Sequence, residues 1–556
     1  MRNKVAYQTI FSNLFHKLEK IEVFINSEQS VTTKMSTLET KDYKTFTING
    51  EEATFSQIDR ALPGDEVEFI NDKWTPVKRA QYPLIVGIID LKSPYVYGMS
   101  SKGTKQYLFT PYNESYPPFI VGCSERDRTA NKILLVQFSH WEKGQKFPHA
   151  NLVQTLGLSG EFLVEAKALY WQYSPKQLKK YETPFPPTTY NRIDISDKPT
   201  LNIDPPGCKD IDDILTIYED ETTKKQMLVI TISDVAESIQ PGTDLDIHAS
   251  QVGQSLYSAF LPPRNMLPTQ LSEGALSLLP DQKRLGISLF VEIPTTTTTK
   301  TVPTHYFAQT IIQNQCTYTY ESIFTAAPKL VNMIQQAAAA LGCDEKDKDD
   351  PHKWIETFMV FYNTEVAKLL AAHKVGIFRG QNESTKVERY KKICPELANE
   401  AAEFTSYEDI RPHFSLGLEK YCYASSPIRR YVDILNQRCL KRILLSQKQE
   451  NQQNISIETA NALQKQAKCH SRDDFFLSKL TKTTHVVEGI VFSCEPTSPS
   501  PSEQKAKIYI PEWKRIISVR ENLKQDEKVT IKYFYNPNKV AWKKRIVFEV
   551  CFPSPV

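Results

Sequence analysis

The stretch Leu201–Ile217 reads LNIDPPGCKDIDDILTI and holds four aspartates within ten residues, Asp204, Asp210, Asp212 and Asp213. Carboxylates at this density repel one another and raise one another's pKa. A divalent cation reverses that cost. Because all of these ligands are oxygens and two prolines and a glycine shape the loop, a hard ion such as Mg2+ or Mn2+ suits the stretch better than zinc. The stretch therefore predicts a metal site.

An acidic surface loop is the alternative interpretation of the same four residues. The flanking residues are apolar or β-prone, among them Ile203, Ile211 and Ile214. Such flanks indicate that the loop is anchored in a hydrophobic core, where unpaired charge is costly. A catalytic or structural role would justify that cost, so we favour a site over a solvated loop.

The whole-chain composition limits the class of protein. A chain of 556 residues is expected to hold several domains, since single cores rarely exceed about 250–300 residues. With 40% hydrophobic and 24% charged residues it has the composition of a folded globular protein. The net charge of +3 means that any basic surface must be local. Ten cysteines without a CxxC pair, and no long apolar run, predict a soluble intracellular protein, most simply cytoplasmic.

Residues 40–190 alternate short apolar strands with turn residues, a pattern typical of small β-barrels. Examples are Thr45–Ile48, Asp65–Phe69, Leu84–Ile89 and Ile133–Phe138. We predict two consecutive five-stranded barrels at 40–80 and 81–190, after an N-terminal extension at 1–39 in which an amphipathic helix is possible. Aromatic residues and lysines share the loops, which suits single-stranded nucleic acid, although core packing is the other reading.

Residues 191–482 carry the longest helices and the chemistry. A strand is predicted at Val229–Val235, beside the acidic loop, and a core helix at Trp354–Leu370. In the cluster Ser425–Tyr431 a Ser-Pro pair predicts a helix start, whose N-terminus attracts anions. The adjacent Arg429 and Arg430 make a phosphate site plausible there, with solvated charge as the alternative.

The alternating pattern returns at 483–556 and predicts a third small barrel, with strands at Val486–Phe492, Lys507–Ile510 and Val529–Phe534. Near its end, Trp542 stands among four basic residues of the stretch Lys539–Arg545. We expect Trp542, Lys543 and Lys544 to contact RNA.

Several ordered motifs resemble the ribonuclease II and ribonuclease R family of 3′-to-5′ exoribonucleases, which includes the eukaryotic exosome nuclease. These motifs are IDPPGCKDIDD (203–213), ISDVAESIQPGTDLDIHA (232–249), MLPTQLSEGALSLLPDQKRLGIS (266–288), SPIRRYVDI (426–434) and, in the predicted second barrel, WEKGQKFPHANLVQTLG (141–157). The resemblance implies a multidomain α+β protein: two N-terminal cold-shock OB β-barrels, a central α/β RNB catalytic domain and a C-terminal OB β-barrel.

The resemblance also implies roles for individual residues. The four aspartates correspond to the family's metal-site acids, and Asp212, Arg429 and Arg430 are expected to be catalytic, with Arg429 on the scissile phosphate. Aromatic packing on the terminal bases is implied for Tyr257 and Tyr320, and we expect Arg379 to bind RNA as well.

The implied function is processive 3′-to-5′ hydrolysis of single-stranded RNA to nucleoside 5′-monophosphates by Mg2+-dependent in-line attack of water, with Mn2+ as a substitute ion. A monomer is expected, with no membrane partner. Since no PIN domain is recognised, stable docking to the exosome is not expected.

The sequence departs from the family pattern at a few positions. Ser425, Gln437 and Gln381 stand where the family usually shows Thr, His and His. One alternative is therefore an RNB-fold RNA-binding regulator with weak or no catalysis, against which the retention of all four aspartates argues. A metal-dependent hydrolase of another polyanion is a further alternative, but it would not need three barrels around its site.

Overall fold

The computed structural model describes residues 36–176, 192–294, 303–384, 400–448, 455–480, 485–496, 504–536, 539 and 542–551. The possible N-terminal helix lies outside these residues. The chain divides into two compact units, Met1–Thr155 and Leu156–Val556. Each unit is described by itself.

The first sheet of the N-terminal unit is antiparallel and has the strand order β3-β2-β1-β4-β5. Its strands are β1 (Ser36–Thr40), β2 (Thr45–Ile48), β3 (Glu51–Thr54), β4 (Glu66–Ile70) and β5 (Lys73–Lys78). Asn49 and Gly50 join β2 to β3 and both have positive φ, the conformation of a tight hairpin turn. β1 begins a few residues before the predicted boundary at 40.

The second sheet of this unit closes on itself, because β6 pairs with both β10 and β8. Its strands are β6 (Ile85–Ile89), β7 (Gly98–Met99), β8 (Lys105–Pro111), β9 (Phe119–Gly122), β10 (Lys132–His140) and β11 (His149–Leu158). At Gly87 the strands β6 and β8 approach each other so closely that a Cβ would lie 2.3 Å from the carbonyl oxygen of Thr110. The glycine therefore permits the closure.

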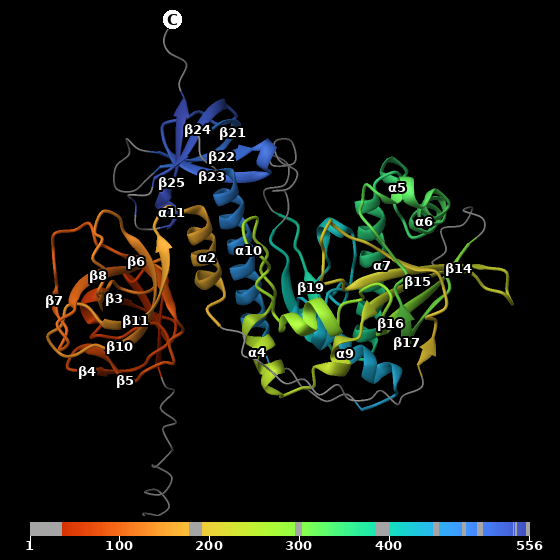
Figure 1. The fold of residues 1–556 in the computed structure, drawn as a ribbon, viewed down its shortest axis with the longest axis horizontal. Helices are drawn as coiled ribbons and strands as arrows, with labels where there is room; N and C mark the ends of the chain where they lie inside the picture. Colours follow the sequence, from red (N-terminus) through yellow and green to blue (C-terminus); the bar gives the residue numbers. More distant parts are fainter. Residues whose placement is uncertain are drawn as a thin grey trace, which may run out of the picture. The chain divides into compact units, whose positions relative to one another are not determined.

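The second unit is built on a seven-stranded mixed sheet of order β12-β17-β16-β15-β14-β13-β18 (Figure 1). Its strands are β12 (Ile193–Asp194), β13 (Thr200–Ile203), β14 (Asp213–Glu219), β15 (Gln226–Ser233), β16 (Lys283–Ile293), β17 (His305–Gln313) and β18 (Cys316–Tyr318). Alternate residues of β15 enter two different cores, Leu228 one and Val229 the other. Both faces of the sheet are therefore buried.

Helices cover one face of this sheet. The core there includes side chains of α6 (Pro328–Ala340), α7 (Pro351–Ala372) and α9 (Tyr431–Leu444). The other helices and the small sheet of this region are α3 (Val235–Ser238), α4 (Asp244–Val252), α5 (Ile323–Ala326), β19 (Ile377–Gly380) and β20 (Glu403–Ser406). The predicted helix at Trp354–Leu370 is confirmed by α7.

A second five-stranded antiparallel sheet follows, of order β23-β22-β21-β24-β25. Its strands are β21 (His485–Pro496), β22 (Gln504–Ile510), β23 (Arg515–Arg520), β24 (Lys528–Tyr535) and β25 (Ile546–Cys551), and α11 (Trp542–Arg545) precedes the last. The helices α2 (Phe162–Tyr173) and α10 (Ile457–Lys479) pack against each other nearby (Figure 1).

The fully buried Arg545 ties α2 to this last sheet. It forms an ion pair with the equally buried Glu165 of α2 and donates to Ser159 Oγ at 2.9 Å and to the Lys539 carbonyl oxygen at 2.7 Å. Sequence alone groups Arg545 with the other basic residues around Trp542. Instead it is a structural residue, because its guanidinium has all of these partners inside the protein.

The predicted helix start at the Ser-Pro pair is wrong. Residues 427–429 form a turn, and α9 begins at Tyr431 with Arg430 as its N-cap, without a side-chain cap. The polar groups of Ser426 serve other partners, since its N–H donates to Asp433 and its hydroxyl accepts from Arg429. Among the helices of the described residues, none is both long and apolar enough to cross a bilayer.

Candidate active site

The acidic loop connects two antiparallel strands of the central sheet. β13 ends at Ile203 and β14 begins at Asp213, so residues 204–212 form the connection. Leu201, Ile203 and Leu215 are buried in the core beneath it. The predicted anchoring of the loop in a core is confirmed.

Asn202 orients the first acid. This residue is 1% exposed, and its side-chain amide donates to Asp204 Oδ2 at 2.8 Å. Its Oδ1 accepts from Asn314 and Thr317, both at 2.8 Å. These bonds fix the amide, which in turn fixes the carboxylate. Sequence reasoning missed Asn202; the available signal is a polar residue in an otherwise apolar strand.

Asp210 is engaged by two side chains. The hydroxyl of Tyr257 donates to its Oδ2, and the thiol of Cys208 donates to its Oδ1 at 3.7 Å. The ring of Tyr257 is 42% exposed. The predicted base-stacking residue thus has a hydroxyl fixed on an acid and a ring partly open to solvent.

Asp212 holds Arg429. The carboxylate is 3% exposed; its Oδ1 accepts the backbone N–H of Ile428 and its Oδ2 accepts Arg429 Nε, both at 2.9 Å. Burial raises the pKa of Asp212 to about 7, although Arg429 opposes the shift. Because the buried carboxylate of Asp212 is already paired with the guanidinium of Arg429, it positions the arginine and is the least available of the four acids as a metal ligand.

Arg429 is held at two of its nitrogens. Besides the Nε bond to Asp212, Nη2 donates to Ser426 Oγ at 3.0 Å. Burial opposes ionisation, but Asp212 and then Tyr257 raise the pKa of Arg429 above its ordinary value. The side chain is 43% exposed, and Nη1 has no hydrogen bond to any described residue. A fixed cation with one free donor therefore faces outward beside the acids.

The protein stabilises the ionised forms of Asp213 and Asp204 poorly. Burial raises the pKa of Asp213, and the charges of Asp204 and Asp212 raise it further. Burial also raises the pKa of Asp204, against the hydrogen bond from Asn202. Carboxylates in this situation are stabilised by a cation, and an all-oxygen set fits Mg2+ or Mn2+.

The acids do not, however, converge as a finished metal cage. Across the described ranges, no three His, Cys, Asp or Glu side chains form a group that could hold an ion. Carboxylates without a cation repel one another, so a closed cluster is not expected before an ion draws them together. The donor chemistry fits the ion, and metal binding stays a prediction.

Tyr320 follows β18 and lies beside the same acids. Burial, and then the charges of Asp204 and Asp213, raise the pKa of its hydroxyl to about 12. One face of the ring is covered by His352, with ring centroids 3.6 Å apart. The predicted contact with a terminal base can therefore use only the other face.

Arg430 and Arg379 lie on the ring of Tyr423, at 4.0 and 4.6 Å from its centroid. Arg430 also donates to Asp433 at 2.7 Å. Arg379 is only 5% exposed, and its Nη1 has no partner among the described residues. The structure thus places Arg379 behind Tyr423 rather than on the surface, and its contact with RNA stays a prediction.

The predicted residues of the last barrel lie far along the chain from these groups. Lys544 is exposed in α11. The side chains of Trp542 and Lys543 lie outside the described part of the structure. The role of all three in RNA binding stays a prediction.

The departures from the family pattern have structural partners. Gln437 accepts from Ala236 N–H at 2.9 Å and donates to the Ser233 carbonyl oxygen at 2.7 Å, which ties α9 to β15 and α3. Ser425 accepts from Asn363 at 3.1 Å. Gln381 donates to the Glu400 carbonyl oxygen at 2.8 Å. These substitutions leave the local hydrogen bonding satisfied.

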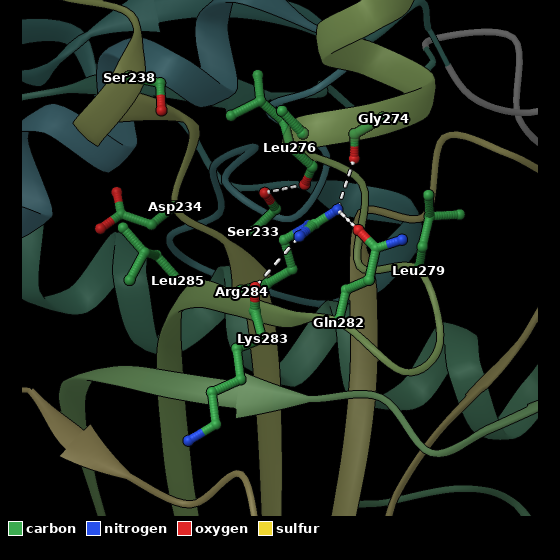
Figure 2. A pocket seen from close by; sticks show the side chains of 11 residues that line it. Ser233, Asp234, Ser238, Gly274, Leu276, Leu279, Gln282, Lys283, Arg284 and Leu285 are labelled. Atoms are coloured by element: carbon green, nitrogen blue, oxygen red, sulfur yellow. Dashed lines mark hydrogen bonds between the residues drawn. The ribbon is translucent and has the colours of Figure 1, made fainter. Parts of the chain in front are cut away.

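A cavity of about 560 Å3 opens at the end of β15, where Ser233 and Asp234 line it (Figure 2). Its charged side chains already have partners: Asp234 accepts from Arg192 and Lys441, Arg284 donates to carbonyl oxygens of Gly274 and Ser277, and Lys283 pairs with Asp194. None of the four aspartates of the loop lines it. This cavity is therefore not the candidate site.

Family models match two parts of the chain. The RNB domain matches residues 192–330 and 325–446, and the Dis3-like cold-shock domain 2 matches residues 106–174. The first match contains the acidic loop and both arginines.

Curated relatives agree with these matches. Ribonuclease R of Buchnera aphidicola subsp. Schizaphis graminum is 26% identical over 340 residues, 46% of this chain and 46% of the relative. The exosome complex exonuclease RRP44 of Homo sapiens is 24% identical over 454 residues, 64% and 47% of the two chains. The chain thus spans about half the length of the curated relatives it matches.

Solved structures show the same fold. RNase R of Mycoplasma genitalium, in complex with ribose-methylated single-stranded RNA, has a TM-score of 0.68 at 18% identity and covers 93% of this chain and 100% of its own. The yeast pseudonuclease Ssd1 has a TM-score of 0.58 at 14% identity, covering 90% and 81%. The predicted multidomain architecture is confirmed.

Proposed function

The chain belongs to the RNB family of ribonuclease II and ribonuclease R, and from that premise we propose that it is a processive 3′-to-5′ exoribonuclease that releases nucleoside 5′-monophosphates from single-stranded RNA. The observation that carries the proposal is the pair Asp212–Arg429 at the edge of the acidic loop. It holds a cation beside carboxylates that are themselves short of positive charge.

Arg429 would bind the scissile phosphate. Its Nε and Nη2 are fixed inside the protein, which leaves Nη1 to meet a non-bridging phosphoryl oxygen. A donor held in place before the reaction stabilises the charge that develops on that oxygen without reorganising. Removing such a donor costs roughly 10²–10³ in rate.

Asp204, Asp210 and Asp213 are the residues that would hold the metal, since Asp212 is occupied by Ile428 and Arg429. A bound Mg2+ ion would polarise the phosphodiester and lower the pKa of a bound water. Tyr257 keeps Asp210 in place through its hydroxyl. Its partly exposed ring would stack on a base, a contact worth about 1–3 kcal/mol that does not depend on sequence.

A digestion assay tests the proposal. The full chain with Mg2+ should shorten a 5′-labelled single-stranded RNA from its 3′ end, nucleotide by nucleotide, and should leave a circular RNA of the same sequence intact. Asp197→Asn, an exposed acid outside the loop, serves as the matched control for aspartate variants.

An RNA-binding regulator without hydrolysis is the second candidate. The similarity to the fold of a pseudonuclease supports this reading, and the presence of all four aspartates argues against it. Tight binding of the linear RNA without any shortening over a long incubation would favour the regulator. A monomeric state, an intracellular location and the lack of stable exosome docking remain proposals that size measurement and pull-down can test.

A further inference from the structure

A cavity of about 310 Å3 opens beside Arg429 and Tyr257. Its walls come from the loop after α4, the turn before α9 and the helix α10. The side chains that matter are Tyr257, Tyr423, Arg429, Arg430, Lys468 and His470. The volume is at the lower end of small-molecule pockets, roughly 300–1,000 Å3, so the cavity suits one nucleotide rather than a strand.

The lining is cationic. It contains two arginines and one lysine, and no aspartate or glutamate. Arg429 and Arg430 each have a carboxylate partner, Asp212 and Asp433, that lies outside the lining. Lys468 has neither an ion pair nor a hydrogen bond within the described residues and is exposed. The pocket therefore keeps a positive charge that an anion would neutralise.

His470 supplies a second, independent observation. It is 1% exposed, and its Nε2 has no hydrogen-bond partner among the described residues. The ring is fixed by stacking on Tyr170, with centroids 5.1 Å apart. A buried polar nitrogen without a partner is costly, and it indicates a group that a ligand supplies.

Charges of both signs surround the pocket, since Asp473 and Asp474 act on His470 while Arg379 acts on Lys468. Burial, and then the charge of Arg379, lower the pKa of Lys468, while Glu403 opposes that shift. Arg379 lies behind Tyr423 with an unpaired Nη1. The charge of Arg379 therefore acts on the pocket, although Arg379 does not line it.

We propose that this pocket binds the 3′-terminal nucleotide of RNA bearing a terminal phosphate, so that the protein prefers 3′-phosphorylated single-stranded ends. Lys468 and Arg430 bind the terminal phosphate, and His470 Nε2 hydrogen-bonds to the same nucleotide. The nature of the ligand rests on the proposed function, because the pocket shares Arg429 and Tyr257 with the candidate active site.

Binding without turnover tests the inference. The full-length protein is titrated in EDTA against a fluorescent single-stranded RNA with either a 3′-hydroxyl or a 3′-phosphate end. We expect about tenfold tighter binding of the phosphorylated end, equivalent to about 1.4 kcal/mol. The same RNA with its phosphate at the 5′ end controls for the added charge and should not bind more tightly than the RNA with a 3′-hydroxyl end.

Variants of α10 locate the effect. Lys468→Met should remove the tenfold preference and Lys468→Glu should reverse it, whereas Lys465→Met, an exposed lysine of the same helix outside the pocket, should keep it. Equal binding of both ends by the unaltered protein overturns the inference. It is also overturned if Lys468→Met keeps the preference or if Lys465→Met loses it equally.

The inference and the proposed function fail separately. If neither RNA is shortened with Mg2+ while the 3′-phosphate still binds more tightly through Lys468, the pocket stands and the nuclease does not. If both RNAs are shortened but bind equally in EDTA, the nuclease stands and the preference does not.

Discussion

At the residue scale, the four acids are not equivalent. Asp212 spends both oxygens on Ile428 and Arg429, whereas no hydrogen bond to the side chain of Asp213 occurs within the described residues. Two adjacent aspartates therefore have different roles. Asp212 orients the guanidinium of Arg429, and Asp213 remains available to a metal ion.

Asp212→Asn should uncouple binding from hydrolysis. The amide oxygen can still accept the N–H of Ile428, but the charge that fixes Arg429 is lost. We expect RNA affinity within about twofold of the unaltered protein and a rate lower by roughly 10²–10³. Single-turnover digestion and equilibrium binding measure the two, with Asp197→Asn as control. A rate close to that of the control would contradict the role of the pair.

Tyr320→Ala should lengthen the smallest product of digestion. The ring lies beside Asp204 and Asp213 with one face on His352, so its removal takes away a stacking surface near the reacting bond. Product lengths are read on a sequencing gel. Tyr320→Phe keeps the ring and should give the original ladder; an unchanged ladder from both variants would remove the stacking role.

At the element scale, the fold depends on a few close approaches and buried pairs. β6 closes the second barrel by crossing β8 at Gly87, and α2 is fixed to the last sheet by Arg545. Both contacts join elements that are not neighbours in sequence. Each can be broken by one substitution.

Gly87→Ala should destabilise the N-terminal unit. The new Cβ would lie 2.3 Å from the Thr110 carbonyl oxygen and 2.7 Å from the Phe109 ring, so the strands must separate. We expect a loss of about 1–3 kcal/mol, the usual cost of overpacking. The loss in free energy of unfolding is measured by chemical denaturation, with the protease sensitivity of this unit as the readout. Gly122→Ala is the matched control, because its Cβ would meet Thr104 only at 3.8 Å.

Glu165→Gln should destabilise the second unit more than the double variant Glu165→Gln/Arg545→Met. Removing one member leaves the other charge buried and uncompensated, which costs about 3–5 kcal/mol, while an apolar replacement of the arginine removes that charge. Denaturation midpoints of the two variants are compared with the unaltered protein. A single variant as stable as the double one would show that the pair is not the anchor.

At the scale of the whole molecule, the proposed activity requires an ion that the acidic loop attracts. Chelation with EDTA should abolish hydrolysis, and Mg2+ or Mn2+ should restore it, because the four aspartates of the loop offer only oxygen ligands. RNA affinity should fall by much less, since basic and aromatic side chains make the contacts with RNA. Digestion and binding assays on one preparation measure both. Undiminished hydrolysis in EDTA would contradict a metal-dependent mechanism.

The sequence by itself determined several strands, the presence of small barrels and the position of the acidic loop. It did not determine that the second barrel, predicted with five strands, has six, or that the strand predicted to reach Val235 ends at Ser233. Apolar alternation and turn residues are local signals, so β2 coincides with the predicted Thr45–Ile48, and α7 extends the predicted Trp354–Leu370 by only a few residues at each end. The density of aspartates identified the candidate site for the same reason.

Only the tertiary structure decided what each residue of the site does. Arg429 meets Asp212 across 217 positions, and Arg545 meets Glu165 across 380. No local pattern encodes such partners. Burial then determines whether a cation stays open to solvent or holds the fold: Lys468 is exposed, whereas Arg545 is buried among its partners. The start of α9 was missed for a related reason, because the polar groups of Ser426 bond to Asp433 and Arg429 instead of capping a helix.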